Sequence, residues 1–476
     1  MVAEGQTISA IEFLTGDISL MIASSDGLVA QWFPVRDEKG DEHLTKIREF
    51  NQHKGQQIVT IAPEERRKGF LLADASGQVG VYHSTANRQV IVDTFTKPEE
   101  MRHIAVSPRA DVMLIEQKNG DIQVWDIHNE HPEISLSALW GKVWYESHEQ
   151  PKYLWQSSSA SNDFEPKFSL MPLAFGTLKA AFYAMLVAVP IAIFGAIYAA
   201  YFMSPGMRKV VKPTIEIMEA LPTVILGFLA GLWLAPVIEM NLPGVFMLLF
   251  MLPMVVLASA YAWWKFVPKS VKYKIPPGWE AALLIPSILF AGWLAFTLSY
   301  PVEVWLFGGD MRLWLNSIGI DFDQRNALVV GIAMGLAVIP SIFSITEDAV
   351  FSVPKHLTTG SLALGATLWQ TMTRVVILTA SPGIFSAVMI GIGRAVGETM
   401  IVLMATGNTP VMDFSIFQGL RTLSANIAVE MPESEVNSTH YRVLFLSGLV
   451  LFVFTFFFNT LAEIVRHRLR RKYSSL

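Results

Sequence analysis

The sequence predicts a membrane domain made entirely of helices, preceded by a β-rich domain that forms part of a propeller. Of the 476 residues, 52% are hydrophobic and 16% are charged, which is too apolar a composition for an ordinary soluble protein. The apolar residues are concentrated after about residue 169, and three similar strand-and-turn repeats occur before it. We therefore expect a β-rich domain over residues 1–155, a linker over 156–168 and a helical membrane domain over 169–476.

Composition also excludes several classes of protein. The net charge is −5, and no run of lysine and arginine precedes the first apolar run, so nothing indicates nucleic-acid binding. The absence of cysteine excludes disulfides, iron–sulfur clusters and cysteine-based zinc sites. The N-terminal residues do not show the basic segment and apolar core of a signal peptide.

The β-rich domain is predicted from three similar stretches, at 20–32, 70–82 and 112–125. Each has an apolar strand, a polar turn with glycine, and a second strand of alternating residues that ends in an aromatic residue. The glycine-to-aromatic spacing is the same each time, in the pairs Gly27/Trp32, Gly77/Tyr82 and Gly120/Trp125. Repeat periods of about 50 and 43 residues are typical of propeller blades, and the last stretch resembles the end of a WD40 blade. A closed propeller needs about four to eight blades. With about three, either the protein continues upstream, which we favour, or the repeats form an open sheet.

The helical domain is predicted from seven apolar runs, each long enough for a membrane span of about 20 residues. They lie at about 170–202, 221–240, 243–263, 281–300, 327–347, 379–405 and 441–463. Basic residues follow the odd-numbered runs, at Arg208, Lys209, Lys212, Lys265, Lys269, Lys272, Lys274, Lys355, Arg374, Arg466, Arg468, Arg470, Arg471 and Lys472. By the positive-inside rule these runs end in the cytoplasm, so the C-terminus is cytoplasmic and residues 1–168 lie outside. Since no visible segment would carry residues 1–168 across a membrane, we expect a signal or transmembrane helix upstream.

The apolar run 382–407 contains two charges one helical turn apart, Arg394 and Glu398. A charge at the centre of a bilayer costs roughly 2.5–3.5 kcal/mol, so such residues usually have a function. On one continuous helix, Arg394 would lie near the middle and Glu398 about 6 Å further along the same face. We predict a substrate pathway that contains Arg394, Glu398 and Thr399, in which the guanidinium binds an oxyanion and Glu398 holds or releases Arg394.

Two alternatives explain the same residues without a pathway. In the first, Arg394 and Glu398 neutralise each other, although this order of charges is the weaker one on a helix. Gly393 and Gly397 form a Gly-x-x-x-Gly pattern, which predicts close approach of another helix whatever the charges do.

Residues 354–374 predict a compact projection from the membrane domain. A short amphipathic helix, a break at Gly365 and a second short helix suit the groove of a partner, and a plain helix–loop–helix connection is the alternative. Just before this segment, we interpret Glu347 and Asp348 as exposed charges that cap the end of the fifth run.

The string Ala-Leu-Gly-Ala-Thr-Leu-Trp-Gln-Thr at 363–371, with Pro-Gly-Ile at 382–384, resembles the cytoplasmic EAA loop of ABC importer permeases. The resemblance implies a coupling helix that sits in a cleft of an ATPase subunit. It assigns this contact to a set of six residues: Leu357, Ser361, Leu364, Gly365, Ala366 and Trp369. The sequence departs from the family at 359–361, where Thr-Gly-Ser replaces Glu-Ala-Ala.

Two further strings, Glu-Ala-Leu-Pro-Thr-Val-Ile-Leu-Gly-Phe at 219–228 and Gly-Arg-Ala-Val-Gly-Glu-Thr-Met at 393–400, resemble the PstC type of bacterial phosphate permease. The resemblance covers about 170–240 and 327–470, and residues 241–326 look like an inserted helical hairpin. It implies the type I transmembrane domain of an ABC importer in the bacterial cytoplasmic (inner) membrane. The implied partners are a second permease subunit (PstA type), an ATP-binding subunit (PstB type) and a periplasmic phosphate-binding protein (PstS type).

No enzyme site is predicted in this chain. The sequence has no Gly-x-x-x-x-Gly-Lys-Ser/Thr phosphate loop and no cluster of histidine and carboxylate residues with metal-ligand spacing, so we expect no cofactor and no ATP hydrolysis here. Two alternative functions stay open: transport of another oxyanion such as sulfate or molybdate, and a membrane sensor or scaffold that does not transport.

Overall fold

The computed structural model describes residues 5–37, 39–51, 53, 55–94, 101–159, 165–268, 282 and 284–473. The chain divides into two compact units, the first made of Met1–Pro172 with Glu433–Leu444 and the second of Leu173–Pro432 with Phe445–Leu476. Several residues of the sequence analysis lie outside the described residues: Lys269, Lys272, Lys274 and part of the predicted linker, 160–164. The same holds for the side chains of Arg470 and Lys472.

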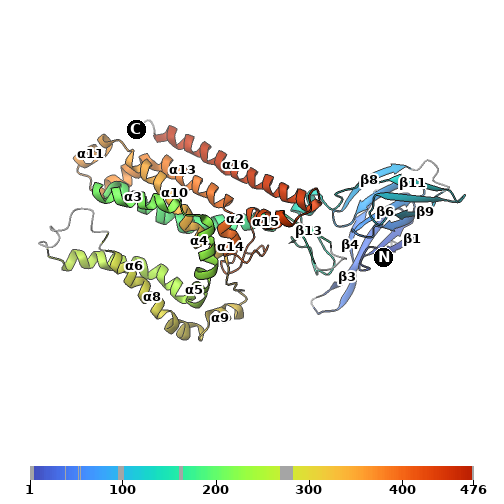
Figure 1. The fold of residues 1–476 in the computed structure, drawn as a ribbon, viewed down its shortest axis with the longest axis horizontal. Helices are drawn as coiled ribbons and strands as arrows, with labels where there is room; N and C mark the ends of the chain where they lie inside the picture. The colour runs from blue at the N-terminus through green and yellow to red at the C-terminus, as the bar shows by residue number, and fades with distance from the viewer. Residues whose placement is uncertain are drawn as a thin grey trace. The chain divides into compact units, whose positions relative to one another are not determined.

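Among the described residues, the first unit contains three antiparallel sheets of three or four strands, in which the strands follow one another in chain order (Figure 1). The first sheet consists of β1 (Ile8–Phe13), β2 (Leu20–Ser24), β3 (Val29–Arg36) and β4 (Glu42–Phe50). The second consists of β5 (Ile58–Pro63), β6 (Gly69–Asp74), β7 (Gln78–His83) and β8 (Arg88–Thr94). The third consists of β9 (Met101–Val106), β10 (Val112–Gln117) and β11 (Ile122–Asp126). Each predicted repeat is a hairpin of one sheet, which confirms the β-rich expectation.

The sheets of the first unit stack face to face. Met21 of the first sheet packs with Phe70 and Tyr82 of the second, while the other face of the second sheet packs on Met113 and Ile115 of the third. Apolar residues therefore cover both faces of the middle sheet, which is the stacking expected of propeller blades.

The first unit extends past the predicted boundary at residue 155. The short strands β12 (Trp155–Gln156) and β13 (Lys167–Phe168) pair with each other, and helix α1 (Leu136–Trp140) precedes them. The ring of Phe168 stacks on His440 at 5.8 Å. The unit therefore includes residues on both sides of the membrane helices in the sequence.

The second unit has, among the described residues, seven segments that are long and apolar enough to span a membrane, as predicted. They are Met171–Phe202, Thr223–Met240, Leu242–Phe266, Leu284–Ser317, Ala327–Phe351, Leu368–Gly397 and Thr439–Arg468. The segment Ala327–Phe351 is a single helix, α10, and it is the most buried of the seven. It therefore forms the centre of the unit, against which the functional helices pack.

Helices α3, α4, α13 and α14 pack against α10, and α6 and α8 form a separate pair (Figure 1). The helices of this unit before α10 are α2 (Met171–Ile197) with a π-helical turn (Tyr198–Phe202), α3 (Pro205–Glu219), α4 (Thr223–Leu229), α5 (Ala235–Met240), α6 (Leu242–Phe266), α8 (Leu284–Phe307) and α9 (Met311–Ser317). Those after it are α11 (Lys355–Ala363), α12 (Leu368–Thr371), α13 (Ile377–Gly397), α14 (Met400–Ala405), α15 (Leu423–Glu430) and α16 (Thr439–Tyr473).

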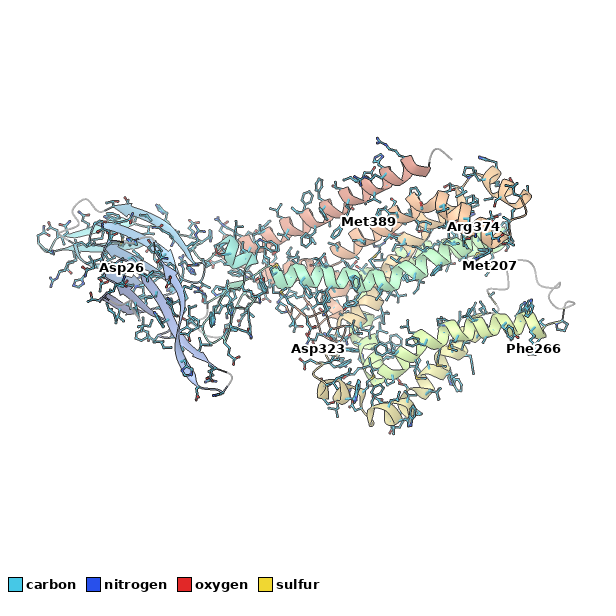
Figure 2. The ribbon with its side chains drawn as sticks, turned by 180° about the vertical axis from the view of Figure 1, so that it is seen from behind. Asp26, Met207, Phe266, Asp323, Arg374 and Met389 are labelled. Carbon is cyan, nitrogen blue, oxygen red and sulfur yellow. The ribbon has the colours of Figure 1, made fainter. Side chains whose placement is uncertain are left out.

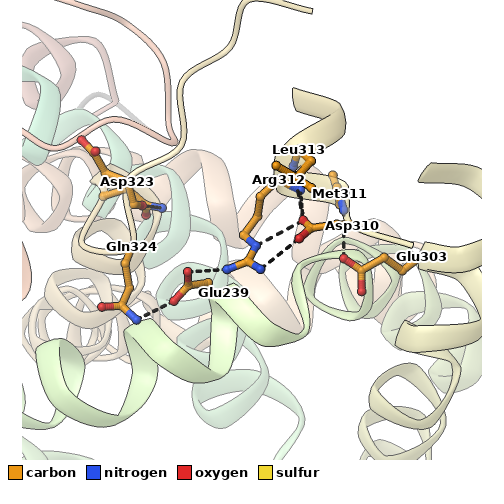
Figure 3. Close-up of polar contacts among 9 residues, drawn as sticks. Glu239, Glu303, Asp310, Met311, Arg312, Leu313, Asp323 and Gln324 are labelled. Carbon is orange, nitrogen blue, oxygen red and sulfur yellow. Dashed lines mark hydrogen bonds and ion pairs between the residues drawn. The ribbon is translucent and has the colours of Figure 1, made fainter. Parts of the chain in front are cut away.

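Helices α6 and α8 form the hairpin that the sequence analysis interprets as an insertion. A polar network anchors its end (Figure 3): Arg312 donates to Glu239 at 2.6 Å and to Asp310 at 3.0 Å, and Gln324 donates to the other oxygen of Glu239. Asp310 also caps the start of α9, and Glu303 accepts from a backbone N–H there at 2.9 Å. Since no residue of α6 beyond its first turn is buried, the hairpin is held at this end and presents an apolar surface elsewhere.

Candidate functional site

Two helices of the second unit are interrupted, and the interruptions bring the candidate site together. Helix α3 ends at Glu219, and α4 begins after Pro222, which lacks a backbone N–H and restricts the residue before it. Helix α13 ends at Gly397, because Glu398 adopts an extended conformation with ψ 126°. In membrane transporters, such discontinuous helices commonly form substrate sites.

Past their interruptions, α4 and α14 pack closely against each other. A Cβ on Gly227 would lie 2.8 Å from the backbone oxygen of Met400. Glycine therefore permits a backbone contact that a larger residue would prevent, and this contact fixes the two half-helices side by side.

The interruption at Glu398 corrects the prediction of one continuous helix over 379–405. Arg394 lies in the last turn of α13 and not in the middle of a helix. The predicted helical pair of Arg394 with Glu398 does not form, because the extended backbone at Glu398 turns this side chain toward the next helix.

Arg394 instead meets residues from two other helices. Its Nη1 donates to Oε1 of Glu219 on α3 at 2.7 Å, and Ser341 Oγ on α10 donates to the same oxygen at 2.7 Å. Arg394 Nη1 also contacts Ser341 Oγ. Ser341 is buried, whereas the side chains of Arg394 and Glu219 are 29% and 44% exposed. The guanidinium is thus neutralised by a carboxylate that is itself partly exposed.

Glu398 has a local structural contact in place of the predicted ionic one. Its carboxylate accepts from the backbone N–H groups of Met400 at 3.2 Å and Ile401 at 3.3 Å, which caps the start of α14. Its backbone oxygen accepts from Ser424 Oγ at 3.0 Å, and Thr399 Oγ1 donates to the Gly397 oxygen at 3.3 Å. Glu398 therefore positions the interruption beside Arg394.

The predicted glycine contact is also absent within this chain. A Cβ on Gly397 would meet no atom within 4 Å among the described residues, and one on Gly393 would meet only the Asn459 side chain at 3.4 Å. Among the residues that the structure describes, no other helix makes a close backbone approach at this Gly-x-x-x-Gly pattern.

Sequence reasoning missed Glu219 as a member of the site. The residue stands 175 positions before Arg394, at the end of a helix and directly before Ala-Leu-Pro. The signal available in the sequence was an acidic residue shortly before a proline that interrupts an apolar segment. This signal did not indicate that the residue pairs with Arg394.

A second set of ion pairs joins α3 to α10, roughly two to three turns of α3 before Glu219. Arg208 and Lys212 both pair with Glu347, the latter at 2.9 Å, and Lys212 also pairs with Asp348 at 2.7 Å. The interpretation of Glu347 as an exposed capping charge is wrong, because its side chain is fully buried. Asp348, at 67% exposed, fits that interpretation. Helix α3 is therefore attached to α10 by ion pairs near its start and by the hydrogen bond between Ser341 and Glu219 at its end.

The projection at 354–374 has the predicted shape of helix, glycine break and helix. Gly365 has φ +88°, and Thr367 with Gln370 forms a capping box at the start of α12. Ser361 Oγ lies 3.0 Å from Thr371 Oγ1 and joins the two short helices. The tip is apolar and open, since Leu364 is 91% and Trp369 65% exposed. Of the other predicted contact residues, Gly365 is exposed and Leu357, Ser361 and Ala366 are half-buried.

Residues 277–474 match the protein family described as binding-protein-dependent transport system inner membrane component. This part of the membrane domain is similar to the members of that family. The matched residues include the projection, α13 and the interruption beside Arg394. The match begins inside the predicted insertion at 241–326 and includes α8, so the limits of that insertion stay a prediction.

Individual relatives are similar to this chain over most of their length. The probable ABC transporter permease protein YqgH of Bacillus subtilis is 27% identical over 307 residues, which is 64% of this chain and 74% of the relative. The phosphate transport system permease protein PstC of Mesorhizobium japonicum is 27% identical over 313 residues, which is 66% of this chain and 78% of the relative. A solved structure of the MetNI methionine ABC transporter aligns over 63% of this chain and 94% of its own, at 14% identity and a TM-score of 0.32, too low to support a conclusion.

Proposed function

We propose that this chain is the permease subunit of an ATP-driven importer that carries inorganic phosphate across the bacterial cytoplasmic membrane. The observation that carries the proposal is Arg394, which lies where two helices are interrupted and pairs with the partly exposed carboxylate of Glu219. The similarity to proteins named phosphate transport system permease supports phosphate as the substrate.

The proposed mechanism is an exchange of partners at Arg394. Without substrate, the Glu219 carboxylate is paired with the Arg394 guanidinium. A phosphate competes for the same donors, because a guanidinium forms two parallel hydrogen bonds to phosphate oxygens. The buried Ser341 hydroxyl can turn from Glu219 to the bound anion. When Glu219 returns it repels the anion, so one site can both bind and release its cargo.

The proposed link to ATP hydrolysis runs along one helical segment. The exposed Leu364 and Trp369 enter the groove of a separate ATP-binding subunit. From Trp369 the chain is helical to Gly397, so Arg394 lies roughly 38 Å along the same segment. A displacement of the tip is therefore transmitted to Arg394 without an intervening loop.

The proposed orientation follows from the charges of the second unit. Met207, Phe266 and Arg374 lie at one end of this unit, and Asp323 lies toward the other (Figure 2). The end with Met207 carries the basic residues Arg208, Lys209 and Lys212 and would face the cytoplasm. We propose that the first unit is an extracytoplasmic partial propeller, and that a second permease subunit and a periplasmic phosphate-binding protein complete the importer.

Uptake of radiolabelled phosphate into vesicles that contain the whole importer tests the proposal. We expect ATP-dependent uptake that is abolished by excess unlabelled phosphate. Excess sulfate or molybdate should lower the uptake rate by no more than about twofold. Stronger competition by sulfate or molybdate would assign another oxyanion, and the absence of uptake by a complex that hydrolyses ATP would overturn the transport function.

A further inference from the structure

A cavity of about 650 Å³ lies at the basic end of the second unit, apart from Arg394. Its walls come from the π-helical turn after α2, from α3, and from the junction of α10 and α11. The charged residues on the walls are Arg208, Lys209, Lys212, Lys355 and Glu216. The volume is in the range of ligand pockets, about 300–1,000 Å³.

Two of the four basic side chains, Arg208 and Lys212, are held in place by other residues of the chain. The guanidinium of Arg208 lies 3.7 Å from the centre of the Phe351 ring and pairs with the buried Glu347. Lys212 is held by Glu347 and Asp348. These contacts position the donors of both side chains before any ligand arrives.

The other two basic side chains, Lys209 and Lys355, are available to a ligand. Lys209 and Lys355 are exposed, and neither ammonium group forms an ion pair with a residue that the structure describes. Glu216 lies on the wall itself, and Glu347 and Asp348 already pair with Arg208 and Lys212, so the excess positive charge of the cavity comes from Lys209 and Lys355. This balance selects a ligand that carries negative charge.

The rest of the wall is apolar, and this favours a lipid over a free inorganic anion as the ligand. Phe351 is 59% exposed, and Met203 lines the same space. A basic pocket between membrane helices on the cytoplasmic side suits the headgroup of an anionic lipid. We infer that this cavity binds the phosphate group of an anionic phospholipid from the cytoplasmic leaflet. The choice of leaflet rests on the orientation in the proposed function.

The same helix connects the cavity to the transport site. Helix α3 carries Arg208 near its start and Glu219 at its end, roughly 16 Å apart. A lipid bound at Arg208 and Lys212 holds the helix whose other end supplies the partner of Arg394.

Native mass spectrometry of the purified importer tests the inference without measuring transport. Complexes are released from nanodiscs of phosphatidylcholine with one fifth phosphatidylglycerol, and retained lipid is counted. We expect the wild type to retain phosphatidylglycerol. In the double variant K209A/K355A, the amount of retained phosphatidylglycerol should fall by about fivefold for each lysine removed. Lys265→Ala, an exposed lysine of the same end outside the cavity, serves as the matched control and should behave as wild type.

A second measurement on the wild type needs no variant. Inorganic phosphate at millimolar concentration is added before release, and we expect retained phosphatidylglycerol to be unchanged. Displacement of the lipid by phosphate, or equal retention of phosphatidylcholine, would show a free-anion site or a non-selective cavity and would overturn the inference. Because lipid retention is counted directly, its failure is distinguishable from a failure of phosphate uptake.

Discussion

Arg394 is bound through one nitrogen, Nη1, by both Glu219 and Ser341. The geometry leaves the rest of the guanidinium fork for a substrate. A lysine at this position keeps the charge and loses the planar set of donors. We expect Arg394→Lys to insert and assemble normally and to lose phosphate uptake by roughly tenfold or more. The initial rate of uptake in vesicles measures this, with Arg466→Lys on the exposed part of α16 as control. Uptake near wild type would remove Arg394 from the pathway.

Glu219 and Glu398 have different roles in the proposed exchange, and neutral isosteres separate them. In Glu219→Gln, Arg394 loses its counter-charge, so we expect a lower apparent KM for phosphate together with a lower maximal uptake rate, because release slows. In Glu398→Gln, a charged helix cap is lost, and we expect a stability decrease of about 1 kcal/mol with an unchanged KM. If Glu398→Gln shifts the KM and Glu219→Gln does not, the assignment is reversed.

Glu347 offers a test of the buried ion pairs that attach α3 to α10. Glu347→Gln leaves Arg208 and Lys212 without their buried partner, and since both cations are partly exposed, we expect a loss of about 2 kcal/mol. Its neighbour Asp348 is mostly exposed, so Asp348→Asn should change stability by less than about 1 kcal/mol. Thermal unfolding of both variants in detergent measures the difference. Equal effects would mean that burial does not set the strength of these pairs.

At the scale of elements, the helical segment from Trp369 to Arg394 determines how the tip can act on the site. Trp369→Ala and Leu364→Ala remove apolar side chains that are largely exposed. We expect each to weaken co-purification of the ATP-binding subunit by roughly 30-fold, the cost of truncating a central interface residue. Leu449→Ala, which removes an exposed apolar side chain from α16, is the control and should retain the subunit. Full retention in the tip variants would favour the sensor or scaffold function.

The elements that sequence predicts correctly are those fixed by local pattern. Seven spans follow from runs of apolar residues, and the sheets follow from repeated strand, turn and aromatic spacing. The interruption at Glu398 does not follow, because an apolar run with one carboxylate is equally compatible with a continuous helix. The partner of Arg394 is 175 residues away, and a helical spacing rule can suggest only the nearer Glu398. Burial of Glu347 depends on α3 lying along α10, which no local pattern encodes.

At the scale of the whole molecule, the distribution of charge in the second unit indicates how that unit lies in a bilayer. Basic residues gather where α3 begins and where α11 projects, while Asp310 and Asp323 lie among the segments that join the other helix ends. Charges on the outer surface of the spans are few, and the α6–α8 hairpin exposes large apolar side chains such as Phe250, Leu257 and Trp293. The hairpin therefore fits contact with membrane lipid.

Because these 476 residues contain no cysteine, a cysteine introduced among them is the one thiol of this sequence, and this permits a direct test of orientation. Asn119 lies in the exposed turn between β10 and β11, and Thr359 lies on the exposed side of α11. With a membrane-impermeant maleimide applied to spheroplasts, we expect Asn119→Cys to be labelled and Thr359→Cys to be labelled only after the membrane is opened. The positive-inside rule requires this result, since Thr359 follows Lys355 and Asn119 belongs to the unit placed outside. Labelling of Thr359→Cys in intact spheroplasts would place the projection outside, where no ATP-binding subunit could reach it, and would overturn the proposed coupling together with the orientation.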